Sequence, residues 1–115
     1  MPRTFATNEV IVGTLHYGHA GLQTSIDDRS LAHLQAVISA KLRRHEGFIF
    51  TCETEAVHGA PRRAFWISAE VPLVFEYAGD EQTPLNREWL EILSRSASSS
   101  NGLRLIAEPV AGSGN

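Results

Sequence analysis

Lys41, the single lysine of this chain, stands two residues before Arg43 and Arg44 near the end of a predicted amphipathic helix. An ammonium or guanidinium group at this place could hold a phosphate, and a partly desolvated amine could also act as a nucleophile. The structural alternative is that the Lys41 stem lies along the apolar stripe of the helix with its ammonium group in water. The two arginines would then complement the negative end of the helix dipole.

A second basic pair, Arg62 and Arg63, is predicted to lie in the loop before the fourth strand. If the two arginine pairs met in space, four guanidinium groups would form a patch able to contact phosphates. The whole chain has 10 basic and 13 acidic residues, a net charge of −3, which excludes a globally basic nucleic-acid binder. We therefore expect weak nucleic-acid binding at most, through Lys41 and the two arginine pairs.

Residue types that support metal binding or covalent catalysis are few and scattered. His16 and His19 have a spacing that could bring two imidazoles to one ion, but two ligands do not make a zinc site. The other candidate ligands have no recognised ligand spacing: His33, His45, Cys52 and His58. The chain contains neither a Gly-x-Ser-x-Gly motif nor a glycine-rich phosphate loop. We expect no metal, no cofactor and no catalytic residue.

The helix that carries Lys41 has both of its ends specified by the sequence. Asp27 can accept hydrogen bonds from the first free backbone N–H groups, and Ile26 and Leu31 occupy the two positions of a hydrophobic staple. Gly47 can adopt the left-handed conformation that ends a helix. The apolar residues recur at helical spacing: Leu31, Leu34, Val37, Ile38 and Leu42.

A second amphipathic helix is predicted to begin at Asn86, with Leu85 and Leu90 in the staple positions, and to end in the segment 98–102. Its apolar side is expected to comprise Trp89, Leu90, Ile92, Leu93 and Ala97.

The remaining segments have the alternation of strands. Strands are predicted over residues 10–17 and 22–26, joined by a turn at 18–21, then over 48–53, 65–71, 73–77 and 103–107. We expect the third to fifth strands to form an antiparallel meander, with Pro72 at a bulge or corner. The order β-β-α-β-β-β-α-β predicts an α+β fold, a mainly antiparallel sheet with two amphipathic helices on one face.

The opposite face of that sheet is a candidate partner interface. If Phe48, Phe50 and Phe65 face the helices, the alternate positions point outward together: Ile49, Trp66 and Val74. An exposed tryptophan with aliphatic neighbours is typical of an interface anchor. The alternative is ordinary exposed apolar area. We expect a protein partner at this face, or a second copy in a symmetric homodimer anchored by Trp66.

The composition predicts one domain. In a chain of 115 residues, 43% hydrophobic content is enough for a single core. Residues 1–8 and 110–115 have little apolar content, so we expect flexible ends around a domain over residues 9–109. A lone cysteine, the absence of a signal-like apolar run and the absence of roughly 18 consecutive apolar residues predict a cytoplasmic protein that makes no membrane contact.

Several segments of the chain together have a recognisable wording: Ile26-Asp27-Asp28-Arg29, Leu31-Ala32-His33-Leu34, Val37-Ile38, Lys41-Leu42-Arg43-Arg44, Phe48, Pro72-Leu73, Pro84-Leu85-Asn86-Arg87-Glu88-Trp89-Leu90-Glu91 and Gly102-Leu103-Arg104-Leu105. From Gly13 to Pro109 the chain resembles a family of small actinobacterial domains of unknown function, many of which are labelled ATP-dependent DNA ligase. The resemblance implies an accessory module associated with ligases. A nucleotidyl-transferring ligase has its reactive lysine in a Lys-x-Asp-Gly setting, whereas Lys41 is followed by Leu42-Arg43-Arg44.

We therefore expect a small non-catalytic interaction or accessory module, with a DNA-related role if the family label applies. The alternative is a nucleotide-binding or ligase-related enzyme in which Lys41 is the working amine.

Overall fold

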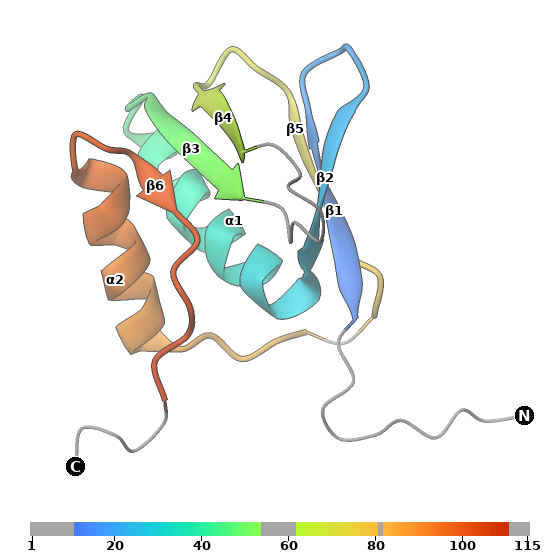
Figure 1. Cartoon of the computed structure of the whole chain (residues 1–115), viewed down its shortest axis with the longest axis vertical. Helices are drawn as coiled ribbons and strands as arrows, with labels where there is room; N and C mark the ends of the chain where they lie inside the picture. Colours follow the sequence, from blue (N-terminus) through green and yellow to red (C-terminus); the bar gives the residue numbers. More distant parts are fainter. Residues whose placement is uncertain (1–10, 54–61, 81, 111–115) are drawn as a thin grey trace, which may run out of the picture.

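A computed structural model describes residues 11–53, 62–80 and 82–110 (Figure 1). The elements are β1 (Val12–Tyr17), β2 (Leu22–Asp27), α1 (Asp28–Arg43), β3 (Phe48–Glu53), β4 (Arg62–Ile67), β5 (Leu73–Glu76), α2 (Arg87–Ser98) and β6 (Leu103–Arg104). The predicted α+β class and the predicted order of elements are confirmed. The end predicted to be flexible at residues 1–8 lies outside the described residues, as does the end at 110–115 apart from Val110.

The six strands of the described chain divide between two three-stranded sheets. The first sheet has the order β2-β1-β5 and is antiparallel throughout. The second has the order β4-β3-β6, with β4 antiparallel and β6 parallel to β3. Because β5 pairs with β1 and not with β4, the predicted meander of three consecutive strands is wrong.

A corner between β4 and β5 explains this pairing. The chain turns after Ser68, whose carbonyl accepts a hydrogen bond from Val71 N at 3.2 Å, and Pro72 O then accepts one from Gly18 N at 2.9 Å. The expected corner at Pro72 is therefore present, and it carries the chain from the second sheet to the edge of the first. The predicted strand over 65–71 ends at Ile67 for the same reason.

The start of each helix follows the prediction. Asp27 Oδ2 accepts a hydrogen bond from Ser30 N at 3.0 Å, and Asn86 Oδ1 accepts one from Trp89 N at 3.2 Å. Each bond satisfies a backbone donor that the first turn leaves free. Neither helix of the described chain combines the length and the apolar character that crossing a bilayer requires.

The end of α1 differs from the prediction. Glu46 N donates to Lys41 O at 3.0 Å and His45 N donates to Leu42 O at 2.9 Å, the hydrogen-bond pattern of a Schellman motif. The residue in the left-handed conformation is His45, with φ of 59°. The prediction that Gly47 takes this conformation is wrong, because the chain reverses two residues earlier.

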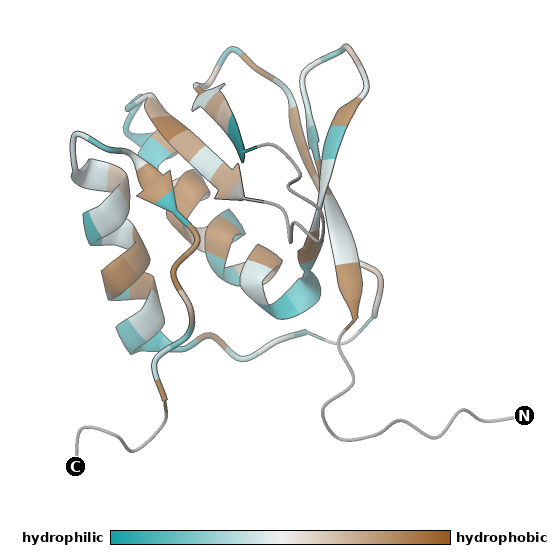
Figure 2. Ribbon diagram, in the orientation of Figure 1, coloured by the Kyte–Doolittle hydropathy of each residue, from teal (hydrophilic) through white to brown (hydrophobic). Residues whose placement is uncertain are grey.

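The core lies between the helices and the inner faces of the two sheets. α1 contacts β1, β2 and α2, while α2 contacts β3 and β6. Figure 2 shows hydrophobic segments in β3 and β6 and, alternating with hydrophilic ones, along α1 and α2. The fully buried apolar side chains come from both sheets and both helices: Leu15, Leu31, Leu34, Ile38, Phe50, Ile67, Leu93 and Leu103.

Candidate partner-binding groove

A groove of about 560 Å³ lies where the C-terminal ends of α1 and α2 meet the start of β3 and the end of β4. It is lined by Lys41 and Arg44, which the sequence indicated as phosphate contacts, and by Ile49 and Trp66, which it indicated as interface residues. Residues from the predicted phosphate site and residues from the predicted partner interface therefore line the same groove.

Lys41 is buried in the wall of this groove, with 11% of its side chain exposed. Its Nζ donates to Ser98 Oγ at 3.0 Å and lies 3.2 Å from Glu46 Oε1. Because the negative ends of two helix dipoles meet here, an ammonium group is favoured at this position. The ammonium group is thus held by protein groups instead of reaching open water, and it links the ends of the two helices.

Arg44 and Glu46 form the solvent-facing rim beside Lys41. Arg44 Nε lies 3.3 Å from Glu46 Oε2, and the two side chains are 59% and 44% exposed. Hydrogen bonds from Arg44 first, and from Lys41 second, lower the pKa of the Glu46 carboxyl group. An exposed pair of this kind contributes little to stability, so Arg44 can exchange Glu46 for another carboxylate.

Trp66 stands on the outer face of β4, opposite Ile49 of β3, and is 54% exposed. A Cβ added to Gly47 would lie 2.9 Å from Trp66 Cζ2, so the absence of a side chain at Gly47 makes room for the indole against the backbone. On the backbone side, Tyr17 Oη donates to Trp66 O at 2.6 Å. Gly47 therefore makes room for the ring, while Tyr17 fixes the backbone from which it projects.

Gly102 shapes the neighbouring wall of the groove. It has φ of +83°, and a Cβ there would lie 2.5 Å from Ile49 O. Glycine is thus required for β6 to approach β3 in parallel.

The other predicted site residues lie elsewhere. Arg43 lines a different cavity on α1. Arg62 and Arg63 are the first two residues of β4, so their predicted place in a loop is wrong; they pair with Glu53 and Cys52 at the far end of the β3–β4 ladder. At about 3.3 Å per residue, Arg62 is roughly 13 Å along the strand from Trp66. The structure does not bring the two arginine pairs together, so it forms no four-arginine patch.

Two further candidates also lie apart from the groove. Arg63 Nη1 donates to Gln23 O at 3.0 Å, which joins the two sheets. Val74 belongs to β5 of the first sheet, opposite His16, and is 55% exposed. Ile49 and Trp66 are cross-strand neighbours, whereas Val74 does not line the groove.

The potential metal ligands do not cluster in the described part of the chain, which contains no group of three or more metal-ligating side chains. His16 Nε2 lies 2.6 Å from Glu76 Oε1 on the outer face of the first sheet. His58 lies outside the described residues.

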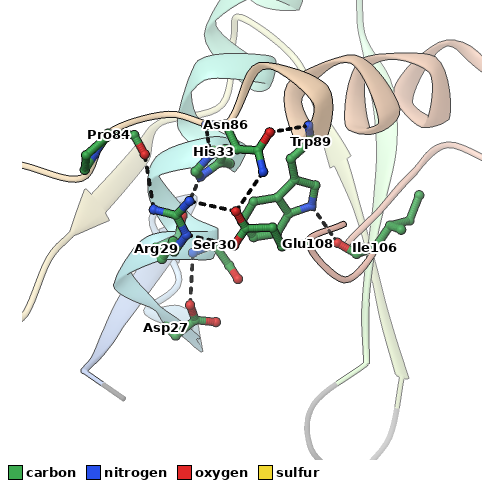
Figure 3. A network of polar contacts seen from close by, with 9 residues as sticks. All are labelled: Asp27, Arg29, Ser30, His33, Pro84, Asn86, Trp89, Ile106 and Glu108. Atoms are coloured by element: carbon green, nitrogen blue, oxygen red, sulfur yellow. Dashed lines mark hydrogen bonds and ion pairs between the residues drawn. The ribbon is translucent and has the colours of Figure 1, made fainter. Parts of the chain in front are cut away.

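Sequence reasoning missed a polar network between the N-terminal ends of the two helices and the segment after β6 (Figure 3). Arg29 forms two hydrogen bonds to Glu108, Nε to Oε1 at 2.8 Å and Nη2 to Oε2 at 2.7 Å. Asn86 Nδ2 donates to the same Oε2 at 2.8 Å. The bonds from Arg29 and then from Asn86 lower the pKa of Glu108 to about 2. Spacing gave no signal of this pairing, because 79 residues separate Arg29 from Glu108.

His33 is fully buried within this network. Its Nε2 accepts a hydrogen bond from Asn86 N at 2.8 Å, and its Nδ1 lies 2.8 Å from Arg29 O. Because Nε2 accepts this bond, it carries no proton, and the imidazole is neutral with its proton on Nδ1. Its ring packs 4.3 Å from that of Trp89, whose Nε1 donates to Ile106 O at 2.7 Å. With both nitrogens occupied, His33 positions α2 on α1.

Residues 12–108 match the family described as Domain of unknown function (DUF7882), which covers most of the chain. The chain therefore belongs to this family. No curated protein and no solved structure matches the chain.

Proposed function

We propose that this member of the DUF7882 family is a small non-catalytic interaction module that binds an extended segment of a partner protein at the groove around Trp66. One observation carries the proposal: a tryptophan that is 54% exposed lies against Gly47 on the wall of a groove of about 560 Å³. Rigid aromatic side chains with apolar neighbours and a charged rim are the usual anchors of protein interfaces.

The size of the surface supports a short segment as the occupant. Strands of six residues rise about 20 Å and lie about 4.8 Å apart, so the outer face of the second sheet has a footprint of roughly 300 Å² at most. A stable interface between two folded proteins buries about 800 Å² on each partner. An extended peptide anchored on Trp66 and Ile49 fits the available area better than a second copy of the chain.

The state of Lys41 supports a non-catalytic role. An amine that is 11% exposed and held by Ser98 and Glu46 is committed to joining the ends of the two helices. Of the two cations that line the groove, only Arg44 is well exposed, which is too little charge for direct DNA binding. Any role in DNA-related processes would therefore come through the partner protein. A cytoplasmic location agrees with the buried free thiol of Cys52, because reducing compartments preserve thiols.

The experiment is a selection of random ten-residue peptides displayed on phage against the wild-type chain, followed by counter-selection against Trp66→Ala. Val74→Ala is the matched control, because Val74 is an equally exposed apolar residue on the other sheet. We expect peptides that lose at least tenfold in affinity for Trp66→Ala and bind Val74→Ala like the wild type.

Circular dichroism and denaturant unfolding verify that both variants fold. The proposal would be overturned if the selected peptides bound Trp66→Ala as tightly as the wild type, or if the selection yielded no binding peptide. A wild-type dimer at tens of micromolar in sedimentation, converted to monomer by Trp66→Ala, would instead identify a second copy of the chain as the partner.

A further inference from the structure

A second cavity, of about 690 Å³, lies between α1 and the segment that connects β5 to α2. Its volume falls within the 300–1,000 Å³ range of small-molecule sites. It is separate from the groove around Trp66, and no residue lines both. A ligand here would therefore give the domain a binding activity beyond the proposed function.

The connecting segment forms an arch, described except for residue 81, that is bonded on both sides to the first turn of α1. At one end, Asp28 Oδ1 and Oδ2 accept hydrogen bonds from Ala78 N at 3.1 Å and Gly79 N at 2.8 Å. At the other end, Pro84 O accepts a hydrogen bond from Arg29 Nη1 at 3.1 Å. These bonds tie the described parts of the segment on either side of the cavity to the start of α1.

The floor of the cavity is one face of α1 on which small side chains recur once per turn, at Ala32, Ala36 and Ser39. These side chains leave the space under the arch open. Two polar side chains of the lining bond to each other, since Tyr77 Oη donates to Gln35 Oε1 at 2.5 Å. This bond leaves the amide N–H groups of Gln35 free to donate to a ligand.

Opposite charges stand at the two ends of the cavity. Arg43 lies at the C-terminal end of α1, while Asp80 follows Gly79, which is bound to the first residue of the helix. Neither charged side chain has an ion-pair or hydrogen-bond partner in the described chain. At 1.5 Å per residue, the helix face from Ala32 to Arg43 is about 16 Å long.

We propose that this cavity binds a short linear peptide with free termini, its carboxylate on Arg43 and its ammonium group near Asp80. An extended chain covers about 3.3 Å per residue, so four or five residues span the distance. The Gln35 amide and the Ser39 hydroxyl can bond to the peptide backbone between the termini, and Leu85, which is 49% exposed, offers an apolar contact for a central side chain.

The test is an NMR titration of the ¹⁵N-labelled chain with Ala-Ala-Leu-Ala-Ala in three forms: with free termini, acetylated at the N-terminus, and amidated at the C-terminus. We expect the free peptide to shift the amide resonances of residues 32–43 and 77–85, and either cap to weaken binding at least fivefold.

The variants Arg43→Gln and Asp80→Asn make the assignment of each terminus specific. Arg43→Gln is expected to abolish only the preference for a free carboxylate, and Asp80→Asn only the preference for a free amine. Arg95→Gln and Glu91→Gln, exposed positions on α2 outside the cavity, are the matched controls. The absence of localised shifts at millimolar peptide, or binding that is insensitive to both caps, would overturn this inference while leaving the proposed role of Trp66 unaffected.

Discussion

The indole of Trp66 lies against the backbone of Gly47, so closely that a Cβ on Gly47 would come within 2.9 Å of Cζ2. Gly47 does not have a positive φ, so its lack of a side chain serves this contact and not the turn that ends α1. The orientation of the anchor in the proposed partner-binding groove depends on one missing methyl group.

Gly47→Ala is accordingly expected to displace the indole and to weaken binding of the selected peptides about tenfold, or about 1.4 kcal/mol. The shift in Trp66 fluorescence emission and the peptide affinity measure the effect. Gly79→Ala is the control, because the nearest atom to its added Cβ is 3.4 Å away. Unchanged emission and affinity in Gly47→Ala would show that the indole contact is unimportant.

Lys41 is expected to take no covalent adenylate when the protein is incubated with labelled ATP and a divalent metal, because its amine is occupied by Ser98 and Glu46. Lys41→Met is instead expected to lower the free energy of unfolding by about 1 kcal/mol, because it removes the hydrogen bond that joins the ends of the two helices, while the exposed Ser98 and Glu46 can bond to water. Denaturant unfolding measures the loss. A labelled band that Lys41→Met abolishes would support the enzyme alternative and contradict the module.

The Arg29–Glu108 pair should make stability depend on pH in the acid range. The pKa of Glu108 is about 2 in the folded state against 4.5 ordinarily, so its contribution is complete above about pH 4.5 and is lost as the pH falls toward 2. After allowing for the partial exposure of both side chains, we expect Glu108→Gln to cost about 1–2 kcal/mol at pH 7 and almost nothing at pH 2.

Thermal or urea unfolding of the wild type and Glu108→Gln across pH 2–7 checks this difference. Glu88→Gln, an exposed change on α2, controls for the loss of a negative charge. A constant gap between wild type and Glu108→Gln over the whole range would contradict the assignment.

His45→Gly should stabilise the protein by about 0.5–1 kcal/mol, since it relieves the left-handed strain of a residue with φ of 59° at the cost of a more flexible unfolded chain. Arg44→Gly, one position earlier with φ of −96°, should destabilise it instead. Paired urea unfolding curves decide between these signs, and a destabilised His45→Gly would show that the imidazole makes a compensating contact.

Single-stranded and duplex DNA are expected to bind no more tightly than the roughly 10⁻⁴ to 10⁻⁶ M of non-specific contacts at physiological salt. The net charge of −3 and the separation of the arginine pairs both oppose stronger binding. Titrations at two salt concentrations, with Arg44→Ala beside Arg95→Ala, measure it. Submicromolar binding that only Arg44→Ala weakens would identify the groove as a nucleic-acid site.

Features decided by near neighbours could be predicted from the sequence. The caps at Asp27 and Asn86, the amphipathic helices and the alternation of β3 all depend on residues within a few positions of one another. The exposure of Trp66 beside Ile49 followed from the same alternation and one strand pairing.

The tertiary structure alone decided which distant groups meet. Arg43 and Arg44 are adjacent in sequence, but successive helix residues point about 100° apart, so they reach different cavities. The pairing of β5 with β1, the burial of Lys41 between two helix ends and the bond from Asn86 N to His33 each join residues more than 50 positions apart. No local pattern encodes such contacts, because they form only when the whole core packs.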